Sequence, residues 1–270
     1  MPTPSLLMIP SAFKSGVLAS VLPSDGAGDF TVSRPSIATR VNADGIIETM
    51  AADVPRLDYS DGGCPVLLTE PQSTNLITRS EDFSYANYNN ASVELEADVS
   101  PDGNITADKV TLNGSYSAVR KNYTYIAGVT YTISFYAKRV SGTDTLFMID
   151  NTNSVTITSF NLTNEWARYS GTFTPGSDTS LVYWLRTTSV SSPNVFLIWG
   201  AQLEEQSSPT SYIKTEATAV TRLADVVTVA PPAGVTEIIE TIDGVEQAPI
   251  TTIPATYSVP VGNINSIEMN

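Results

Sequence analysis

The sequence predicts an all-β protein whose centre is a β-sandwich or barrel. Two observations carry this prediction. Apolar and polar residues alternate in many short runs, as in half-buried strands, and helical periodicity is nearly absent. Turn residues separate the runs at roughly the 8–12-residue spacing of sandwiches and barrels. With 270 residues, the chain can hold one such domain and smaller flanking pieces.

Residues 1–76 are rich in proline and glycine, with short apolar pieces between the turns. We expect strands here near residues 30–34, 46–49, 55–59 and 64–68. Such strands are too short and too far apart to build a rich core alone. We therefore expect an extended N-terminal β segment that lies along a partner surface, or along the next domain, as an anchor.

Residues 77–215 carry the densest strand pattern. From 131 to 138, the odd positions Tyr131, Ile133, Phe135 and Ala137 supply one apolar face. Further strands are expected at 93–97, 145–150, 155–160, 166–173, 180–186 and 194–199. This middle stretch is the predicted sandwich domain.

Residues 216–270 form a third region, predicted to be a small C-terminal β domain. Asp243-Gly244 lies between two alternating runs and is a strong hairpin signal. Prolines flank the runs at 250–253 and 257–259, which favours edge strands or positions between subunits. A piece this short is marginal as a free domain, so we expect it to pack on something or to trimerise.

The charge and the single cysteine exclude several classes. The formal net charge of −14 opposes nucleic-acid binding, which needs Lys and Arg on phosphates, and opposes docking on anionic lipid. No stretch approaches membrane-spanning length, and we expect no membrane partner. One cysteine, Cys64, excludes an intrachain disulfide framework.

The chain has no histidine. Its absence removes Ser-His and Cys-His nucleophiles and the usual general base near neutral pH, so we expect no enzyme. Two carboxylates, Glu81 where the central domain opens and Glu204 at the end of a strand, are candidate ligands for a structural calcium ion, because calcium prefers oxygen ligands. The alternative is that both are solvated strand ends. We expect no other cofactor.

Aromatic and basic residues provide candidates for sugar contacts. Aromatic faces stack on apolar sugar faces, and Arg supplies hydrogen bonds that fix orientation. The candidates are Tyr123, Tyr125, Trp184 and Arg186, with Tyr116 and Tyr183 as neighbours. Because Tyr183 and Trp184 are adjacent on a strand, alternation places them on opposite faces.

Several motifs, taken in order, resemble bacteriophage virion proteins that carry a carbohydrate-binding-module-like jelly roll. The resemblance spans about residues 5–225. The motifs are Ser33-Arg34, Val54-Pro55-Arg56-Leu57-Asp58-Tyr59, Leu67-Leu68-Thr69-Glu70-Pro71-Gln72-Ser73-Thr74-Asn75-Leu76-Ile77, Ser80-Glu81-Asp82-Phe83, Glu165-Trp166-Ala167-Arg168, Trp199-Gly200-Ala201-Gln202-Leu203-Glu204-Glu205, Thr210-Ser211-Tyr212-Ile213-Lys214-Thr215 and Ala219-Val220-Thr221-Arg222.

The resemblance implies a jelly-roll sandwich in a structural component of the phage particle, such as a head fibre, capsid decoration or tail-fibre element. Its location would be the virion, its partners phage capsid or tail proteins, and its assembly a homotrimer. One alternative is a tail-fibre module that binds a host surface glycan. A polysaccharide-degrading tail enzyme is a third; it would need paired carboxylates in a cleft. Family membership alone does not imply a sugar ligand.

Overall fold

The computed structural model describes residues 4–12, 18–21, 30–143, 145–150, 155–176, 179–187 and 193–270. In this part of the chain, regular structure consists of β-strands and two short 3-10 turns. No helix there is long and apolar enough to cross a membrane. The chain divides into a central unit, Ser73–Thr221, and a flanking unit made from Met1–Gln72 and Arg222–Asn270.

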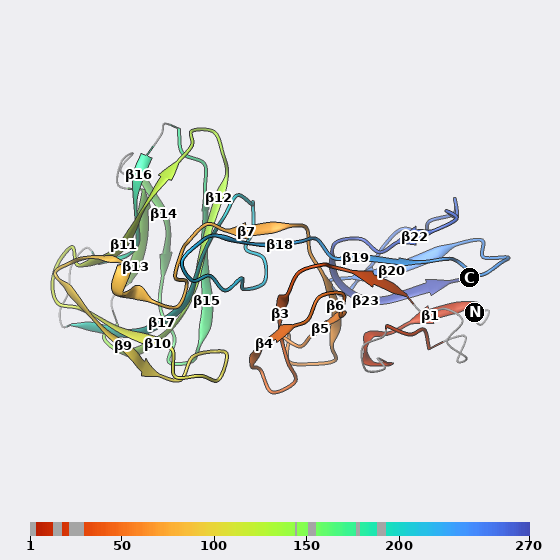
Figure 1. The fold of residues 1–270 in the computed structure, drawn as a ribbon, viewed down its shortest axis with the longest axis horizontal. Helices are drawn as coiled ribbons and strands as arrows, with labels where there is room; N and C mark the ends of the chain where they lie inside the picture. The colour runs from red at the N-terminus through yellow and green to blue at the C-terminus, as the bar shows by residue number, and fades with distance from the viewer. Residues whose placement is uncertain are drawn as a thin grey trace. The chain divides into compact units, whose positions relative to one another are not determined.

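The central unit is a sandwich of two five-stranded sheets (Figure 1). The first, sheet H, has the order β15 (Ala167–Phe173), β12 (Tyr131–Ser141), β17 (Asn194–Glu204), β10 (Ala107–Leu112) and β9 (Ala91–Asp98). The second, sheet G, has the order β14 (Val155–Phe160), β13 (Leu146–Asp150), β16 (Thr179–Arg186), β11 (Ala118–Tyr125) and β8 (Asn87–Asn89). The chain crosses repeatedly from one sheet to the other, as a jelly roll does, and the predicted fold class is confirmed.

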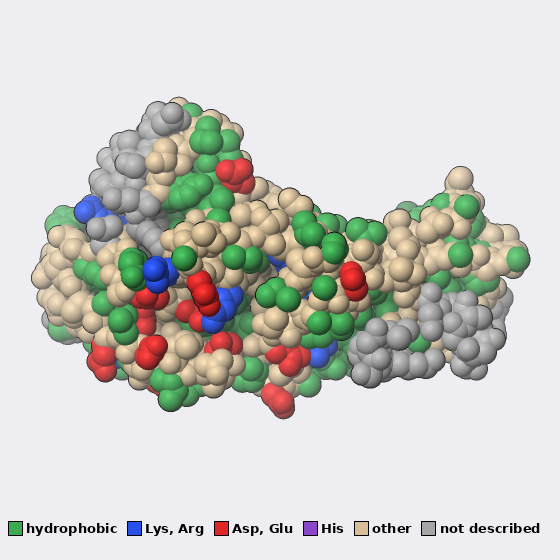
Figure 2. All heavy atoms as spheres, viewed as in Figure 1, with side chains coloured by type: hydrophobic (Ala, Val, Ile, Leu, Met, Phe, Trp, Pro, Cys, Tyr) green, Lys and Arg blue, Asp and Glu red, His purple; other side chains and the backbone are tan. Residues whose placement is uncertain are grey.

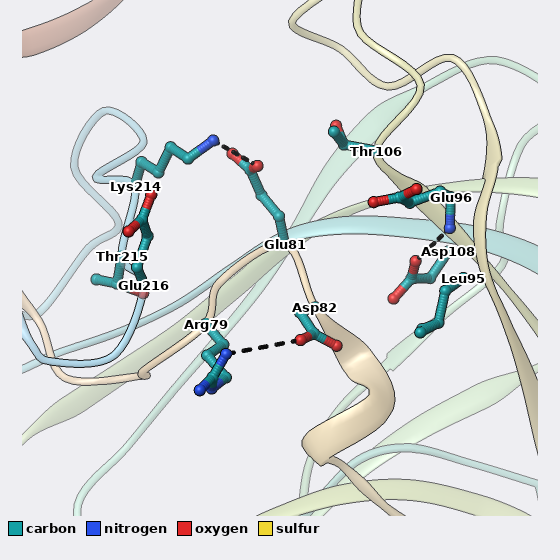
Figure 3. A pocket seen from close by; sticks show the side chains of 10 residues that line it. All are labelled: Arg79, Glu81, Asp82, Leu95, Glu96, Thr106, Asp108, Lys214, Thr215 and Glu216. Atoms are coloured by element: carbon teal, nitrogen blue, oxygen red, sulfur yellow. Dashed lines mark hydrogen bonds and ion pairs between the residues drawn. The ribbon is translucent and has the colours of Figure 1, made fainter.

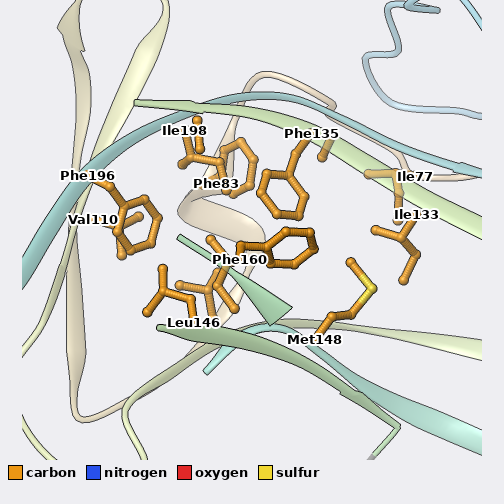
Figure 4. Close-up of a cluster of buried hydrophobic side chains, with 14 of the residues drawn as sticks. Ile77, Phe83, Val110, Ile133, Phe135, Leu146, Met148, Phe160, Phe196 and Ile198 are labelled. Carbon is orange, nitrogen blue, oxygen red and sulfur yellow. The ribbon is translucent and has the colours of Figure 1, made fainter. Parts of the chain in front are cut away.

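The core between the sheets comes from the alternation that the sequence shows. Tyr131, Ile133, Phe135 and Ala137 of β12 are all fully buried, which confirms the predicted apolar face. Figure 4 shows residues from both sheets meeting in this core, together with Phe83 from the 3-10 turn η2 (Phe83–Tyr85). The predicted strands at 131–138, 145–150, 155–160, 166–173, 180–186 and 194–199 correspond to β12 to β17.

The entry segment of the central unit is fixed by one buried amide. Strand β7 (Ser73–Asn75) pairs with β18 (Val220–Arg222), the last strand of the sandwich region. Asn75 Nδ2 donates to the carbonyls of Ala201 at 3.0 Å and Ile213 at 2.8 Å. Its Oδ1 accepts from the backbone N–H groups of Ile77 and Leu203, both at 3.1 Å. All four hydrogen-bonding sites of this buried amide are therefore satisfied.

The flanking unit contains a six-stranded sheet with the path β21 (Val245–Glu246), β20 (Ile238–Ile242), β23 (Gly262–Met269), β6 (Val66–Thr69) and β5 (Arg56–Asp58). Strand β1 (Leu6–Met8) also pairs with β23, and η1 (Pro10–Ala12) follows β1. A three-stranded sheet has the order β2 (Thr31–Ser33), β19 (Val226–Val229) and β22 (Tyr257–Ser258). Strands β3 (Ala38–Val41) and β4 (Ile47–Met50) form a separate hairpin.

The structure corrects the expectation of an extended N-terminal segment and a separate C-terminal domain. Leu6, Met8 and Leu67 from the first segment share one core with Ile264 and Ile267 from the last. Each segment alone has too few apolar strands to enclose a hydrophobic core. Together, the two segments enclose one shared core. The two ends of the chain therefore fold as one unit.

The hairpin prediction at Asp243-Gly244 is confirmed. Strands β20 and β21 pair there, and both turn residues have positive φ, 51° and 74°, as a type I′ turn requires. Residues 250–253 do not form an edge strand within the chain: among them Ile250 makes a single bridge, to Ile238, because the flanking Pro249 and Pro254 cannot donate to a ladder. Their predicted position between subunits stays a prediction.

Candidate functional site

Sheet G carries most of the residues predicted to contact sugar. Arg186 lies at the end of β16, in register with Ala118 of β11 and Phe147 of β13. The neighbouring positions Val119, Leu185, Leu146 and Met148 are buried in the core. Because successive strand residues alternate between faces, Arg186 and Phe147 belong to the outer face of the sheet.

An aromatic ring accompanies Arg186 on this face. The guanidinium carbon of Arg186 lies 5.0 Å from the ring centroid of Tyr116, whose residue is 55% exposed. This distance is within the range of a cation–π contact, in which the ring attracts the guanidinium charge. Phe147 is half-buried. The outer face of sheet G therefore carries a guanidinium group and two aromatic side chains, Tyr116 and Phe147.

A bulge interrupts β16 beside Arg186. Val119 pairs with Leu185, but the next residue, Arg120, pairs with Tyr183, so β16 has one extra residue at Trp184. The register to β13 shifts at the same place, from Phe147–Arg186 to Ile149–Tyr183. Strict alternation therefore does not apply to Tyr183 and Trp184, and the prediction that they point to opposite faces loses its basis. Their side chains lie outside the described residues.

The two remaining predicted sugar residues belong to an aromatic cluster. Tyr125 is fully buried, with ring centroids 5.2 Å from Tyr123, Tyr131 and Phe173. Its ring cannot stack on a sugar, so we no longer assign it to a sugar surface. Tyr123 is half-buried against the same cluster; burial, then Tyr131 and Glu205, raises the pKa of its hydroxyl. Sequence reasoning missed Phe147, although it falls between two core positions in its strand.

A cleft of about 490 Å³ lies elsewhere on the central unit. Figure 3 shows the ten residues that line it: Arg79, Glu81, Asp82, Leu95, Glu96, Thr106, Asp108, Lys214, Thr215 and Glu216. Asp108 is 1% exposed, and its carboxylate accepts from the N–H groups of Phe83 at 2.8 Å and Glu96 at 2.9 Å. It therefore fastens both η2 and β9 to β10.

The pKa of Asp108 is raised above its ordinary value. Burial is the largest cause, and the negative charges of Asp82 and Glu96 add to it, while the two backbone N–H donors act in the opposite direction. The negative charges of Asp82 and Glu96 therefore both disfavour the ionised form of Asp108.

The two predicted calcium ligands have separate partners. Glu81 accepts from Lys214 Nζ at 2.8 Å and from the Tyr212 hydroxyl at 3.0 Å. Glu204 is fully buried and accepts from the hydroxyls of Ser73 and Thr210 and from the Thr210 N–H. Among the described residues, no group of three or more His, Cys, Asp or Glu is arranged to hold a metal ion. Calcium binding stays a prediction.

The acidic composition of the chain is visible on its surface. On the face drawn in Figure 2, acidic side chains are scattered over the described residues, with basic side chains set singly among them. A basic stripe, which binding to a nucleic-acid backbone requires, is not seen on that face.

The flanking unit contains a buried ion network of five residues, and four of them (Arg34, Arg56, Glu70 and Arg222) belong to the motifs that resemble phage virion proteins. Arg34 Nη1 lies 2.9 Å from Asp225 Oδ1, and Arg56 donates to both Asp225 and Glu70. Arg222 lies 3.4 Å from Glu70 and 3.7 Å from Asp225. The three arginine side chains are at most 1% exposed. Burial alone would lower the pKa of Arg56, but Glu70 and Asp225 outweigh it and raise that pKa.

Comparison with known proteins finds a match within the central unit. A family model described as a carbohydrate binding domain matches residues 84–189, less than half of the chain. The matched residues include all five strands of sheet G. A comparison with curated proteins finds no match.

Solved structures with similarity to the chain include carbohydrate-binding modules. An exo-β-agarase aligns at 12% identity and a TM-score of 0.40, over 51% of this chain and 25% of that one. The CBM22-1 xylan-binding domain from Paenibacillus barcinonensis Xyn10C aligns at 14% identity and a TM-score of 0.35, over 48% of this chain and 90% of that one. The enzymatically active domain of tailspike protein 4 from bacteriophage CBA120 aligns at 13% identity and a TM-score of 0.33, over 48% of this chain and 21% of that one. The alignment with the agarase thus covers only about a quarter of the length of the agarase chain.

Proposed function

We propose that the central unit is a non-catalytic glycan-binding module and that sheet G presents its binding face. The observation that carries the proposal is the placement of Arg186 over the exposed Tyr116 ring, beside Phe147. A sugar offers an apolar face to an aromatic ring and hydroxyl groups to a guanidinium, so these groups together suit it. The match of a carbohydrate binding domain family to all the strands of this sheet supports the same function.

A glycan array tests this proposal with two matched variants. Arg186→Ala removes the donor on sheet G. Arg168→Ala is the control, because its guanidinium also lies near a tyrosine ring, 5.4 Å from Tyr136, but on sheet H. We expect wild type and Arg168→Ala to bind the same glycans, and Arg186→Ala to bind them about tenfold more weakly, as loss of a charged hydrogen bond implies. Equal binding by all three would refute the site.

We further propose that the chain is a structural protein of a phage particle, a head fibre or capsid decoration, or alternatively a tail-fibre module that attaches to host glycans. The motif residues Arg34, Arg56, Glu70 and Arg222 support this proposal, since all four belong to the ion network of the flanking unit. The flanking unit, rather than an extended terminal segment, would be the part that attaches to capsid or tail proteins, and the assembly would be a homotrimer.

Light scattering tests the assembly. We expect a mass near three times the 28.9 kDa of the chain, and retention of the protein on capsid or tail components mixed with it. A monomer that binds neither component would refute the virion proposal. The same result would not refute glycan binding by the central unit, because the glycan array tests that proposal separately.

A polysaccharide-degrading activity would need paired carboxylates in a cleft, and the cleft of the central unit contains several carboxylates, so this activity can be tested directly. Two of them already have other partners: Asp108 accepts two backbone N–H groups, and Glu81 is paired with Lys214. We therefore expect no release of reducing ends from any glycan that the array identifies. Release at a rate that Asp108→Asn abolishes would overturn the non-catalytic assignment.

A further inference from the structure

The two sheets of the central unit differ in charge. The strands of sheet G contain the basic residues Arg120, Lys121 and Arg186 and a single acidic residue, Asp150. Asp150 is 4% exposed and lies two residues after the core residue Met148, so it belongs to the core side of β13. The strands of sheet H contain more acidic than basic residues. Sheet G is thus a basic element in a chain whose net charge is −14.

Arg120 shares the outer face of sheet G with Arg186. It follows Val119, which is buried in the core, so its side chain belongs to the opposite face of β11. Ala118, the partner of Arg186, lies two residues before Arg120, or about 7 Å along the strand. Both arginines are half-buried. Two permanent positive charges therefore start from neighbouring positions of one face.

The positions in register with Arg186 form a row across all five strands of sheet G, which Figure 1 labels. Asn89 of β8, Ala118 of β11, Arg186 of β16, Phe147 of β13 and Ser159 of β14 pair in that order. Four strand spacings give the row a length of about 19 Å. The polar residues at its two ends, Asn89 and Ser159, are exposed. The row therefore offers an extended surface with a guanidinium, an aromatic ring and neutral polar groups.

The next row of the same face has the same character. Arg120 and Ile149 both pair with Tyr183 of β16, and Ile149 also pairs with Thr156 of β14. Thr156 is exposed. Among the described side chains of these two rows, two carry a guanidinium and none carries a carboxylate.

The outer face of sheet H is covered by the chain itself. Thr132 of β12 is fully buried, and its hydroxyl donates to the Gln206 carbonyl at 2.8 Å. The side-chain carbonyl of the buried Gln202 accepts from the Ile213 N–H at 2.7 Å. Because residues 206–213 lie over sheet H, an extended ligand finds its open face on sheet G.

We propose that the ligand of sheet G is an anionic polysaccharide, whose carboxylate or sulfate groups bind Arg186 and Arg120 while its apolar sugar faces contact Tyr116 and Phe147. The planar fork of a guanidinium matches such groups with two parallel hydrogen bonds. A neutral sugar needs donors but no second positive charge, whereas a charged polymer presents a repeated anion. This inference rests on the proposed glycan face and adds the class of glycan that it takes.

Binding of the full chain to immobilised polysaccharides in matched pairs tests the inference. The pairs are polygalacturonate, alginate and hyaluronan, each with its carboxyl-reduced neutral form, and dextran sulfate with dextran. At 0.15 M salt, charges more than about 8 Å apart are largely screened, so the groups in contact decide the affinity and not the net charge. We expect at least one anionic polymer to bind tenfold or more tightly than its neutral form. Binding within the first three pairs assigns a carboxylate, and binding in the last pair alone assigns a sulfate.

Three variants assign the preference to the outer face of sheet G. Arg120→Gln should weaken binding of the anionic polymer about fivefold and leave binding of the neutral form unchanged, a difference that a loss of folding cannot produce. Arg120→Lys should lie between wild type and Arg120→Gln, because lysine keeps the charge and loses the planar fork. Arg168→Gln, on sheet H, is the control and should bind like wild type. Unfolding followed by tryptophan fluorescence confirms that each variant folds.

Three results would overturn the inference: anionic polymers bound no more tightly than their neutral forms, equal effects of Arg120→Gln on both forms, or an oligodeoxythymidylate bound as tightly as the best polysaccharide. The last would mean that any polyanion suffices and that the sugar has no role. Neutral glycans that bind in an Arg186-dependent manner, without preference for anionic forms, would refute this inference alone. Failure of every glycan, anionic or neutral, to bind would refute the proposed glycan face as well.

Discussion

Replacement of Asp225 by asparagine should destabilise the flanking unit selectively. Asp225 is 8% exposed, and its carboxylate accepts from Arg34, Arg56 and the N–H of Glu70. Asp225→Asn keeps the shape of the side chain but leaves the three buried guanidinium groups with Glu70 as the single carboxylate of the network. Breaking a buried pair by removing one partner costs about 3–5 kcal/mol. With a urea m-value of about 2 kcal/mol/M, the midpoint should fall by about 2 M.

The three tryptophans provide the internal control for this experiment. Trp166, Trp184 and Trp199 all belong to the central unit, so tryptophan fluorescence follows that unit alone. Far-UV circular dichroism follows both units. We expect Asp225→Asn to shift the circular dichroism transition of the flanking unit and to leave the fluorescence transition in place.

A matched surface variant separates loss of the network from loss of a charge. Asp61→Asn changes an exposed aspartate of the same unit and should alter its stability by less than about 0.5 kcal/mol. If Asp225→Asn behaves like Asp61→Asn, the network does not stabilise the flanking unit and the reasoning is refuted. If both transitions shift together, the two units do not unfold separately.

Three further predictions concern single positions. Gly244→Ala should cost about 1 kcal/mol in urea unfolding, because φ is 74° and no atom lies within 4 Å of the added Cβ; an unchanged midpoint would contradict the type I′ turn. Ile133→Ala should cost about 2–5 kcal/mol in the fluorescence transition, because Ile133 is fully buried, and a cost below 1 kcal/mol would contradict its core position. Carbon-13 NMR should find the pKa of Asp108 above its ordinary value. Since the pKa is higher in the folded state, the stability contributed by Asp108 is present below its unfolded pKa and is lost as pH rises through the folded one; a folded pKa at or below the ordinary value would contradict this.

The strands of the central unit could be predicted because their pattern is local. In β12 the odd positions from Tyr131 to Ala137 all lie in the core, so period-2 alternation is sufficient to find this face. Strand β23 was missed, although it is central to its sheet and pairs with β1, β6 and β20. Asn263, Asn265 and Ser266 in that strand are residues with low strand propensity, and its pairing with β1 joins the two ends of the chain.

The candidate site was predictable only in part, because two bulges break the alternation on which the prediction depended. Arg186 and Tyr116 could be named from residue type, but the extra residue in β16 changes which neighbours share a face. Tyr125 was assigned to a sugar surface, although the aromatic residues around it in space bury it. The cleft could not be predicted, since its walls come from residues 79–82 before η2, from the β9 irregularity and from residues 214–216.

The central claim, that sheet G binds a glycan without chemical conversion, is tested most directly by NMR titration of the nitrogen-15-labelled chain with a glycan selected on the array. We predict chemical-shift changes concentrated on β11, β13 and β16, with Phe147 and Arg186 among the largest, and a glycan that is recovered intact. Changes confined to other surfaces, or a glycan recovered in fragments, would contradict the claim.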